Sequence, residues 1–599
     1  MTPQDAQNTF FSPANIAMIT RGSWLQQPHA PTSPTSGICT DTRDLLQPNQ
    51  QSAPSTSTGQ PLNHTKQGGA TFLTLAGENH DAHTFLPTAA QNGASLLIVD
   101  NPDKTDIATI NSAAPSVAPG ILHVQDTLAA LHALAFAYRD ILADHNVKLI
   151  AVAGSNGKTS TRHLIHALLH GRMISSPTNA SNTSPSPQSI GLPDRERPDL
   201  WRVHQLLGSQ SPKSFNNHIG VPLTILAAPT TDDFLVLEIG TNHPGEVNTL
   251  AAIARPDAAV ITSIGREHLE FFHNIENVAA EQASLLPHLK PNALIAIEKS
   301  AAPLIDAHQD QSPPTQPNHR VTFGFSADAS YALTAFQQDF EGMSLDIQFP
   351  NQQTLNNIHL PFLGRHTAVN IMAAIAVAKW IGIDDIQLNL GFLALTTPPG
   401  RLQRITLQSG ITLIHDAYNS NPDSLHAALD LLTSLYPRGS RSQPSAVAGS
   451  ISPATDSSPA TAVQNKPYSK TIAPGRIAIL GDMLELGEHE TDEHRSASDR
   501  IRDMLAANEL RSAVFIGPRI AAAVEASFQD QPDSITTRIR IFPNISPAAE
   551  PIPQAIHDHL ANIIDPGNIV LIKASRSLAL ERLIPTITKI YPLEAPDDI

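Results

Sequence analysis

The residues that could do chemistry are concentrated in one glycine-rich segment. It reads GSNGKTST over residues 154–161, directly after the apolar run VKLIAVA and before a stretch with helical spacing of leucine and isoleucine. Glycines let the backbone turn so that consecutive N–H groups and a helix N-terminus point at one anion. A following lysine can reach the terminal phosphates of a nucleotide. The segment therefore predicts a phosphate-binding loop.

Roles inside this loop follow from residue type. Lys158 is expected to bind the β and γ phosphates, and the Thr159 hydroxyl is expected to bind Mg²⁺. The match to the GxxxxGK[ST] pattern is incomplete, because Val152 stands where its first glycine is expected. A glycine-rich turn without a ligand is the alternative, but Lys-Thr with a helix behind it favours phosphate. The predicted nucleotide-binding residues are Gly154, Ser155, Asn156, Gly157, Lys158, Thr159 and Ser160.

Two further side chains follow later strand-like runs. Glu238 lies at the end of FLVLEI, and His268 follows AAVITSI. The carboxyl ends of parallel strands share one sheet edge, where oxygen ligands can hold Mg²⁺ beside a nucleotide. A single loop histidine is more often solvated or hydrogen-bonded than a metal ligand. Its pairing with Glu238 behind a phosphate loop reverses that preference, so Thr159, Glu238 and His268 are the predicted metal ligands.

Alternating strands and helices must position these groups. Short apolar runs without polar alternation are typical of buried parallel strands, and they occur at 147–153, 234–239, 258–264 and 293–297. With a helix over 160–170 and further helices between them, they predict a doubly wound α/β domain. A second series predicts another open sheet, with strands at 411–416, 476–480, 513–516, 538–542 and 569–573.

The N-terminal part of the chain carries its own strand and helix signals. TFLTLAG and ASLLIVD read as strands, and residues 127–142 read as a helix. These segments are too far from the phosphate loop in sequence to be expected in its sheet. We therefore expect a separate N-terminal domain.

Length and composition limit the class of protein. A chain of 599 residues with 41% hydrophobic and 16% charged residues predicts three or four folded domains. The net charge of −17 argues against a nucleic-acid partner. The N-terminus lacks the pattern of a signal peptide and no run of 18 apolar residues occurs, which predicts a cytoplasmic protein without membrane insertion.

The single cysteine excludes two kinds of site. One thiol, at Cys39, cannot form an intrachain disulfide or a structural zinc site of several thiolates. A nucleophilic role is not expected either, since no histidine is placed in sequence to activate it. Cys39 is expected to pack as a small apolar residue.

Proline, serine and threonine are clustered in three segments, which are poor in aromatic residues. Such segments bury too little apolar surface to offset the entropy of ordering them. We interpret them as solvent-exposed insertions; a regulatory or partner-binding segment is the alternative. They are residues 47–69, 175–189 and 440–474.

A series of further blocks resembles the Mur ligases from end to end, the three insertions excepted. Besides GSNGKTST, the series comprises FNNHIGVPLTIL, LEIGTNHPGEV, ITSIGREHLEFF, GRHTAVNIMAAIAVA, PPGRLQ, DAYNSNPDS, GDMLELGE and VLIKASRSLALERL. The N-terminal CTDTRDLLQP resembles the UDP-sugar domain of that family. DAYNSNPDS and GDMLELGE discriminate best within the family, and they resemble the branch that adds a dipeptide.

The resemblance implies three α/β domains. They are a UDP-muramoyl-peptide-binding domain over 1–146, a central ATPase domain of the phosphate-loop type with a parallel sheet over 147–398, and a Rossmann-like domain over 399–599. It implies an ATP-dependent ligase, with Mg²⁺, that joins D-alanyl-D-alanine to UDP-N-acetylmuramoyl-tripeptide through an acyl phosphate. Such an enzyme would serve peptidoglycan synthesis, and a monomer is expected.

The resemblance also implies roles for individual residues. Lys158, Glu238, His268 and Arg401 would be catalytic. Further nucleotide contacts would come from Asn370, Arg401, Asp416, Tyr418, Asn419 and Asn421. The substrate-binding residues would be Thr42 and Arg43 at the UDP-sugar, Asn216 and Asn217 in a peptide-binding loop, and Lys573, Ser575 and Arg576 beside the acceptor.

The chain departs from the family pattern at three places. Gln282 stands where many members carry a lysine that is carbamoylated in some of them. Either the neighbouring Glu281 supplies the missing charge, or a second metal is held by fewer protein groups. KASR replaces KGSR, which matters only if Ala574 has a positive φ. KSFNN replaces GNFNN, so Ser214 stands in place of an asparagine.

Two other functions compete with this interpretation. A related ligase that adds a single amino acid, such as another Mur ligase or a folylpolyglutamate synthase, would activate a carboxylate in the same way. A non-catalytic nucleotide-binding scaffold is the alternative from a different class. The joint presence of Gly157, Lys158, Thr159, Glu238 and His268 argues against a scaffold, which has no need of all five.

Overall fold

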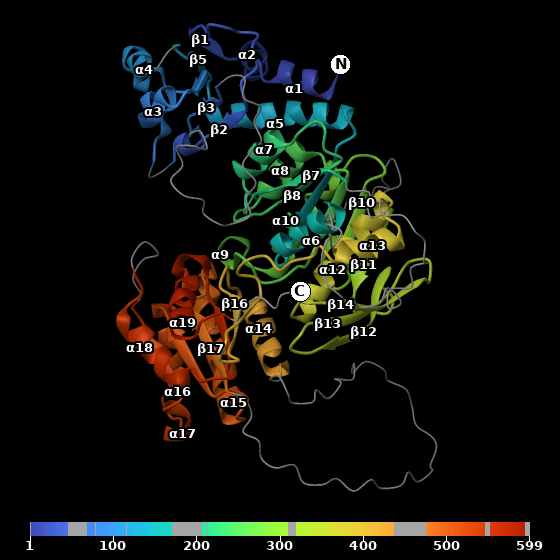
Figure 1. Cartoon of the computed structure of the whole chain (residues 1–599), viewed down its shortest axis with the longest axis vertical. Helices are drawn as coiled ribbons and strands as arrows, with labels where there is room; N and C mark the ends of the chain where they lie inside the picture. The colour runs from blue at the N-terminus through green and yellow to red at the C-terminus, as the bar shows by residue number, and fades with distance from the viewer. Residues whose placement is uncertain are drawn as a thin grey trace, which may run out of the picture.

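The computed structural model contains three β-sheets that follow one another along the chain (Figure 1). It describes residues 2–45, 69–77, 80–114, 117–170, 206–212, 214–308, 319–435, 475–544 and 551–593. The predicted insertions at 175–189 and 440–474, and all of 47–69 except Gly69, lie outside these residues. The mixed α/β class with three sheets agrees with the prediction.

The N-terminal sheet has the strand order β1-β5-β4-β3-β2. Only the β1–β5 pair is antiparallel among its four pairings. The runs TFLTLAG and ASLLIVD contain β3 and β4, as predicted. The elements are α1 (Pro3–Phe10), α2 (Pro13–Thr20), β1 (Ser23–Gln26), β2 (Ile38–Cys39), β3 (Thr71–Leu73), α3 (Leu86–Gln91), β4 (Leu96–Val99), α4 (Ile107–Ala113), β5 (Gly120–His123) and α5 (Thr127–Asp144).

The central sheet has nine strands in the order β14-β13-β12-β11-β10-β9-β6-β8-β7. Its first part comprises β6 (Lys148–Ala153), α6 (Lys158–His170), β7 (Gly208–Gln210), α7 (Gly220–Ala227), β8 (Phe234–Glu238), α8 (Glu246–Ala254), β9 (Ala258–Ile261), α9 (Leu269–Phe272), α10 (Ile275–Ala283), β10 (Leu294–Glu298) and α11 (Ala302–Asp306). The strands from β6 to β10 are parallel and agree with the predicted series.

The rest of the central sheet was not predicted. It consists of β11 (His319–Gly324), β12 (Tyr331–Gln338), β13 (Met343–Gln348) and β14 (Thr354–Leu360), followed by α12 (Arg365–Ile381) and α13 (Asp385–Phe392). β12, β13 and β14 are antiparallel neighbours. In β13 buried and half-buried residues alternate, which is the pattern of a strand covered on one face.

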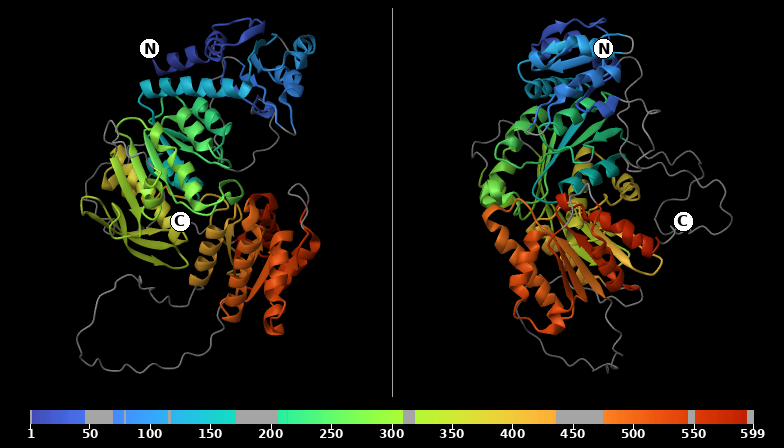
Figure 2. Two further views of the ribbon diagram at one scale, coloured as in Figure 1. Left: turned by 180° about the vertical axis from the view of Figure 1, so that it is seen from behind. Right: turned by 90° about the vertical axis from the view of Figure 1, so that its left-hand side faces the viewer.

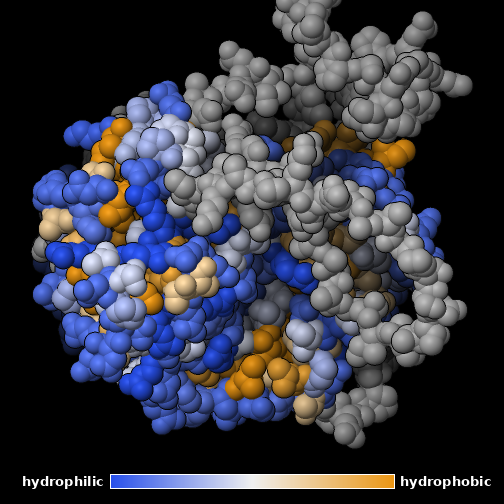
Figure 3. Space-filling model, turned by 90° about the horizontal axis from the view of Figure 1, so that it is seen from below, coloured by the Kyte–Doolittle hydropathy of each residue, from blue (hydrophilic) through white to orange (hydrophobic). Residues whose placement is uncertain are grey.

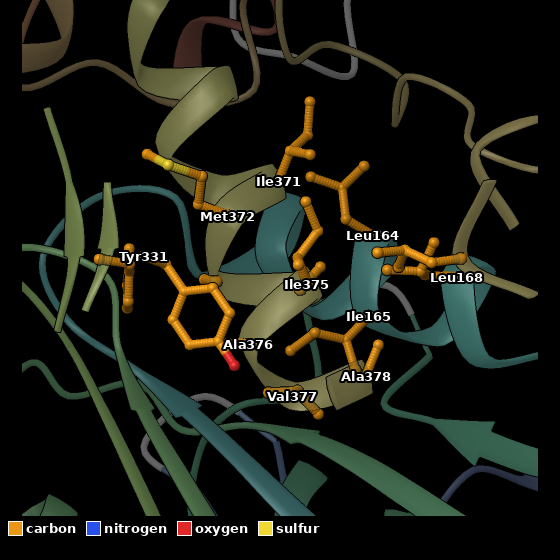
Figure 4. Packing of buried hydrophobic residues seen from close by; sticks show 14 of the residues in the cluster. Leu164, Ile165, Leu168, Tyr331, Ile371, Met372, Ile375, Ala376, Val377 and Ala378 are labelled. Carbon is orange, nitrogen blue, oxygen red and sulfur yellow. The ribbon is translucent and has the colours of Figure 1, made fainter. Parts of the chain in front are cut away.

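Both faces of the central sheet are buried, which explains the continuous apolar runs of its strands. Along β6, Ile150 and Val152 point to the side covered by α6 and α12. Leu149 and Ala151 point to the other side, toward α5, α7 and α8. Figure 4 shows residues of α6 and α12 interlocking on the first face. Helix α6, which begins at the phosphate loop, is therefore packed against one face of the sheet and against α12.

Helix α5 joins the N-terminal part to the central sheet, although the predicted boundary at residue 146 assigns it to the first domain. The Tyr138 hydroxyl donates a hydrogen bond to the Ala228 carbonyl at 2.8 Å. The guanidinium of Arg139 is fully buried and pairs with Asp257 at 2.6 Å. Figure 2 shows α5 lying between the two sheets. It packs against α2 as well as α7 and α8, so it serves two cores.

The C-terminal sheet has the order β15-β16-β20-β17-β18-β19. The five predicted strands are present and parallel, and β15 adds an antiparallel edge. The elements are β15 (Gln403–Thr406), β16 (Thr412–Asp416), α14 (Pro422–Ser434), β17 (Arg476–Gly481), α15 (Glu490–Ala506), β18 (Ser512–Ile516), α16 (Pro518–Phe528), α17 (Asp533–Thr536), β19 (Ile539–Phe542), α18 (Gln554–Ile563), β20 (Ile569–Lys573) and α19 (Ile584–Ile590).

The residues that flank segment 436–474 lie side by side. The Arg476 guanidinium donates from Nη2 to the Leu435 carbonyl at 2.8 Å and from Nε at 3.2 Å. A chain that leaves and returns at one place can be shortened at little entropic cost. We therefore expect deletion of residues 440–474, with a short Gly-Ser joint, to leave ATP turnover within a few-fold of wild type. A folded deletion variant with no turnover would show that this segment takes part in the reaction.

Seen from below (Figure 3), the described surface is mainly hydrophilic, and its hydrophobic groups are small and separate. Within the described ranges, no helix combines the length and apolar character needed to cross a bilayer.

Candidate active site

The predicted phosphate loop connects β6 to α6 in a conformation that requires two glycines. Gly154 has φ +115° and Gly157 has φ +87°. A Cβ on Gly157 would lie 2.5 Å from Asn370 Oδ1, and one on Gly154 would lie 2.5 Å from Thr262 Oγ1. Side chains there would collide with α12 and with the end of β9. Glycine is therefore needed for both the turn and the close packing.

Residues after β9 hold the loop in place. The Ser155 N–H donates to the Ser263 carbonyl, and the Asn156 N–H donates to Ser263 Oγ, both at 2.9 Å. The Gly265 N–H donates to Ser155 Oγ at 2.9 Å. These bonds do not use the N–H groups of Lys158, Thr159 and Ser160 at the start of α6, which have no partner in an earlier turn of the helix; the next N–H, of Thr161, donates to the Gly157 carbonyl at 2.8 Å. Lys158, Thr159 and Ser160 line the cavity, and free N–H groups at a helix N-terminus suit an anionic phosphate.

Lys158 is held by oxygen atoms of its own loop and by an acidic partner. Its Nζ donates to the carbonyls of Gly154 at 2.5 Å and Ser155 at 3.1 Å. It also pairs with Glu267 Oε2 at 3.2 Å. The ammonium group thus lies over the loop, where the phosphates of a nucleotide would compete for it.

Thr159 and Glu238 meet, as the sequence predicts for a metal site. Thr159 Oγ1 donates to Glu238 Oε1 at 3.1 Å. The Asn216 side-chain amide donates to the same oxygen at 3.0 Å. Glu238 Oε2 lies 3.3 Å from Arg162 Nε, and Arg401 donates to Thr159 Oγ1 at 3.1 Å. The site therefore combines a buried carboxylate with two guanidinium groups.

His268 lies at the same cavity but contacts the C-terminal domain. Its backbone has φ +48°, a left-handed conformation that non-glycine residues seldom adopt. Its Nδ1 pairs with Glu485 Oε2 at 2.7 Å. The hydrogen bond from His268 holds the pKa of the Glu485 carboxyl below its usual range. Glu485 belongs to the GDMLELGE block, so this block reaches across to the central domain.

The donor set fits Mg²⁺ bound mainly through a nucleotide. Within the described residues, no three His, Cys, Asp or Glu side chains converge as a preformed metal site. Mg²⁺ often keeps several waters and takes one or two protein oxygens together with substrate phosphates. The Thr159 hydroxyl and the Glu238 carboxylate offer oxygens of that kind. Thr159, Glu238 and His268 remain the predicted ligands.

The C-terminal wall of the site lies at the carboxyl ends of β16 and β20. Asp416 and Lys573 are register partners on these neighbouring strands, and their side chains pair at 2.7 Å. The buried Lys573 also donates to the Asn419 carbonyl at 3.2 Å. The predicted nucleotide-side group Asp416 and the predicted acceptor-side group Lys573 are therefore in direct contact. The Ser575 hydroxyl accepts from the Leu484 N–H at 3.1 Å.

Tyr418 and Asn421 join this wall to the central domain. The Arg401 guanidinium lies 4.2 Å from the centre of the Tyr418 ring, and that of Arg576 lies 5.6 Å away. The Tyr418 hydroxyl donates to Ser214 Oγ. The Asn421 amide donates to Asn156 Oδ1 of the phosphate loop at 2.9 Å. Ser214, which replaces an asparagine of the family pattern, thus binds a residue of the opposite domain.

Arg266 forms a further bridge between the two domains. Its guanidinium pairs with Asp423 at 2.8 Å, near the start of α14, and with Glu493 on α15 at 2.7 Å. The backbone N–H of Arg266 also donates to Asp423 at 2.8 Å. Together with the contacts of His268 and Asn421, these bonds hold the C-terminal domain against the loop that follows β9.

A cavity of about 860 Å³ collects most of the predicted residues between the two domains. The predicted residues that line it are Ser155, Asn156, Gly157, Lys158, Thr159, Ser160, Asn216, Asn217, Glu238, His268, Asn370, Arg401, Asp416, Tyr418, Asn419, Asn421, Lys573, Ser575 and Arg576. Gly154 does not line it and forms the turn at the base of the loop. A polar cavity with a phosphate loop at one wall suits a nucleotide and charged substrates.

Thr42 and Arg43 are the predicted substrate contacts that the structure does not bring to this cavity. They lie on a 3-10 helix, Thr42–Leu45, beside the N-terminal sheet. Arg43 is exposed and pairs with Asp41. Their role at a UDP-sugar remains a prediction for the N-terminal domain.

Several residues of the site were missed from the sequence. Arg162 follows Thr159 by one helical turn, and that spacing could have placed it beside Glu238. Glu267 precedes His268 and could have been noticed as a second acid at the strand end. The contact of Gln282 with the loop had no sequence signal, because it depends on how α10 packs.

The structure decides between the alternatives for Glu281. Its two carboxylate oxygens accept from the Gly245 and Val247 N–H groups, both at 2.8 Å, at the start of α8. Glu281 therefore caps a helix and does not supply charge to the phosphate loop. Ala574 is not among the described residues with positive φ, so KASR fits this backbone without strain.

Cys39 is buried on β2, at the edge of the N-terminal sheet, and is not suited to act as a nucleophile. Burial raises the pKa of its thiol to about 12, with smaller contributions from Asp44 and Asp41. The thiol is therefore protonated at neutral pH, and the thiolate is the reactive form. We expect iodoacetamide to leave ATP turnover unchanged and Cys39 unmodified by mass spectrometry. Loss of activity with alkylation of the native protein would contradict this expectation.

Comparisons with known proteins agree with this architecture. Residues 152–378 match the model of the Mur ligase middle domain. A UDP-N-acetylmuramoyl-tripeptide--D-alanyl-D-alanine ligase of Bacillus subtilis is 28% identical over 95% of this chain and 96% of its own length. The protein of that name from Escherichia coli is 27% identical over 76% of this chain and 90% of its own length.

Solved structures share the fold. A MurF structure from Acinetobacter baumannii has a TM-score of 0.67 at 22% identity and covers 97% of this chain and 99% of its own. A MurF ligase of Thermotoga maritima in complex with ADP has a TM-score of 0.62 at 20% identity, with coverage of 93% and 98%.

The family match and the full-length relatives identify an ATP-dependent ligase, and the three sheets with a phosphate loop facing a cavity agree with that class. The matched central domain and the full-length relatives make the assignment more specific. Residues 152–378 are a Mur ligase middle domain, and nearly the whole chain is similar to ligases that add D-alanyl-D-alanine to UDP-N-acetylmuramoyl-tripeptide.

Proposed function

We propose that this enzyme joins D-alanyl-D-alanine to UDP-N-acetylmuramoyl-tripeptide, with ATP as the energy source. The observation that carries the proposal is the end-to-end match to the Bacillus subtilis ligase of that name, which covers 95% of this chain. The match includes the C-terminal domain, where the acceptor must be recognised. The reaction would supply a precursor of peptidoglycan.

The chemistry requires activation of a carboxylate, which is a poor electrophile. Transfer of the γ-phosphoryl group of ATP to that carboxylate gives an acyl phosphate and ADP. The amine of the dipeptide then attacks the acyl carbon, a tetrahedral intermediate forms, and its collapse releases phosphate and leaves an amide. Phosphoryl transfer depends mainly on positioning and on stabilising charge.

The residues of the phosphate loop supply that stabilisation. Lys158 and the first N–H groups of α6 would bind the phosphates of ATP. Mg²⁺, when bound, would neutralise part of the phosphate charge. Thr159 and Glu238 are the oxygen donors placed to hold it. Arg401, which reaches Thr159, can stabilise charge on the transferred group.

The opposite wall would hold the nucleoside and the acceptor. Asp416, Tyr418, Asn419 and Asn421 are proposed for the ribose and base side of ATP. Lys573, Ser575 and Arg576 are proposed for the dipeptide, and Asn216 and Asn217 for the muramoyl peptide. Closure of the two domains would exclude water, which would otherwise hydrolyse an acyl phosphate. The proposal includes a cytoplasmic location, since ATP and a UDP-linked substrate are used together. It also includes a monomer.

A phosphate-release assay tests the proposal. With ATP, Mg²⁺ and UDP-N-acetylmuramoyl-tripeptide, we expect D-alanyl-D-alanine to stimulate phosphate release, and mass spectrometry to show the pentapeptide product. Single amino acids, D-alanine among them, should not replace the dipeptide. Stimulation by a single amino acid would support a different ligase of the family, and absence of any ATP turnover would support a scaffold.

A further inference from the structure

Glu267 is a buried acid at the phosphate loop for which the proposed reaction has no role. It lies one residue before His268, is 5% exposed and lines the cavity. Its Oε2 pairs with Lys158 at 3.2 Å, and its Oε1 accepts from Gln282 Nε2 at 3.2 Å. The carboxylate is thus fixed at both oxygens and lies next to the lysine that is expected to bind phosphate.

Gln282 ties this carboxylate to the backbone of the loop. Its side chain is fully buried on α10. While its Nε2 donates to Glu267, its Oε1 accepts from the Gly154 N–H at 2.9 Å. One amide therefore sets the distance between the carboxylate and the base of the phosphate loop. Such an arrangement positions a charge and is not needed to fill space, which an apolar residue would do.

Nucleotide binding changes the charge balance at Glu267. Among the described residues, Lys158 is the cation that forms an ion pair with it. When Lys158 turns to the phosphates, a buried carboxylate remains beside an anionic ligand. An uncompensated buried charge of this kind is strongly unfavourable. A divalent cation that enters with the nucleotide would remove the penalty, and a carboxylate oxygen is a preferred ligand for it.

We propose that Glu267 binds the divalent cation that accompanies the nucleotide, directly or through one water, and that Gln282 is the residue that positions Glu267. This inference rests on the nucleotide site of the proposed function, but not on which acceptor is joined. In this proposal Glu267 supplies the negative charge that a carbamoylated lysine supplies in some family members. The two earlier alternatives were that Glu281 supplies this charge, or that the second metal is held by fewer protein groups. The Glu267 carboxylate would thus pair with Lys158 when the nucleotide is absent and with the divalent cation when the nucleotide is bound.

Binding of Mn²⁺ to the full-length protein tests the exchange, with electron paramagnetic resonance reporting free Mn²⁺. In the presence of ADP, we expect Glu267→Gln to weaken protein-bound Mn²⁺ by about ten-fold or more, which corresponds to about 1.4 kcal/mol. Without ADP, wild type and variant should differ little, because Lys158 then occupies the carboxylate. Metal-free ADP should bind the variant more tightly than wild type, since an acidic competitor for Lys158 is gone.

The two opposite shifts separate the proposal from general damage. A misfolded site would weaken both ADP and Mn²⁺. Glu276→Gln is the matched control, because it makes the same change at an exposed residue of α10, the helix that carries Gln282. It should change neither affinity. Equal Mn²⁺ affinity of Glu267→Gln and wild type in the presence of ADP would overturn the proposal. Because these assays contain no acceptor, failure of D-alanyl-D-alanine to be ligated would leave them unaffected.

Variants at residue 282 test the positioning role. Gln282→Met keeps the volume but removes both hydrogen bonds, and should weaken Mn²⁺ in the presence of ADP several-fold while Glu267 is intact. Unchanged Mn²⁺ affinity in this variant, with a melting temperature near that of wild type, would refute the positioning role.

A double variant that moves the carboxylate from residue 267 to residue 282 tests whether the cation needs a carboxylate beside the phosphate loop. In Glu267→Ala/Gln282→Lys, the lysine amine can add to CO₂ and release a proton, forming a carbamate. A carbamoylated lysine is longer than glutamine by a few bonds, so its carboxylate would reach the space that Glu267 now fills. We expect bicarbonate to restore Mn²⁺ affinity in the double variant but not in Gln282→Lys, where Glu267 would repel the carbamate. The proposal is wrong if bicarbonate acts on wild type, or if it fails to act on the double variant while that protein is folded.

Discussion

Lys158→Ala is expected to reduce ligation by roughly 10²–10³-fold or more at saturating ATP, because preorganised charge at a transferred phosphoryl group contributes on that scale. Lys158 Nζ already lies within hydrogen-bonding distance of two loop carbonyls, so its position needs little reorganisation when phosphate arrives. The measurement is phosphate release with all three substrates present. Near-normal turnover would remove the assignment of the phosphate loop.

The same substitution is also expected to lower stability, which the sequence alone did not suggest. A lysine on a surface loop could be removed without cost, but Lys158 balances the buried Glu267. Removing one partner leaves a buried charge. Lys158→Ala/Glu267→Gln should therefore recover most of the lost melting temperature without recovering activity. If the double variant melts no higher than Lys158→Ala, the ion pair does not contribute to the stability of the loop.

Local sequence patterns were sufficient for the elements that carry the loop and the C-terminal wall. β6 and β20 are apolar runs that are buried on both faces, and such runs are recognisable without knowledge of their neighbours. The strands β12 to β14 were missed, although β13 (MSLDIQ) alternates regularly between apolar and polar residues. The neighbouring strands β12 (YALTAFQQ) and β14 (TLNNIHL) do not alternate regularly, so the three did not read as one series. The role of α5 was also missed, since an amphipathic pattern does not say which sheet its apolar face covers.

Site residues could be predicted from the sequence where the residue type and its position relative to a predicted strand or turn indicate one role. Lys158 after a glycine turn and Glu238 at a strand end follow from such rules. The partners of these groups come from distant segments: Glu485 contacts His268, Gln282 contacts Gly154, and Tyr418 contacts Ser214. Contacts of this kind depend on how domains and helices pack. A single sequence does not contain that information in local form.

The ion pair between Asp416 and Lys573 is expected to give the largest stability effect in the C-terminal domain. Lys573 is 2% exposed and Asp416 is 9% exposed. Lys573→Met leaves the Asp416 carboxylate buried without its cation, which costs about 3–5 kcal/mol. For a domain of this size, that corresponds to a melting temperature lower by roughly 6–20 °C. Lys299→Met, which breaks the exposed pair with Asp328, is the control and should change it little.

The double variant Asp416→Asn/Lys573→Met distinguishes a structural pair from a catalytic one. The introduced asparagine side chain would keep an oxygen for the Leu402 N–H, which Asp416 Oδ1 accepts at 3.1 Å, and would carry no buried charge. We therefore expect thermal denaturation to show most of the stability restored. Ligation should remain low, because Lys573 also holds the Asn419 carbonyl beside the proposed ribose site. Recovery of both stability and activity would show that the pair only supports the fold. Recovery of neither would show that Lys573 stabilises the domain through contacts other than Asp416.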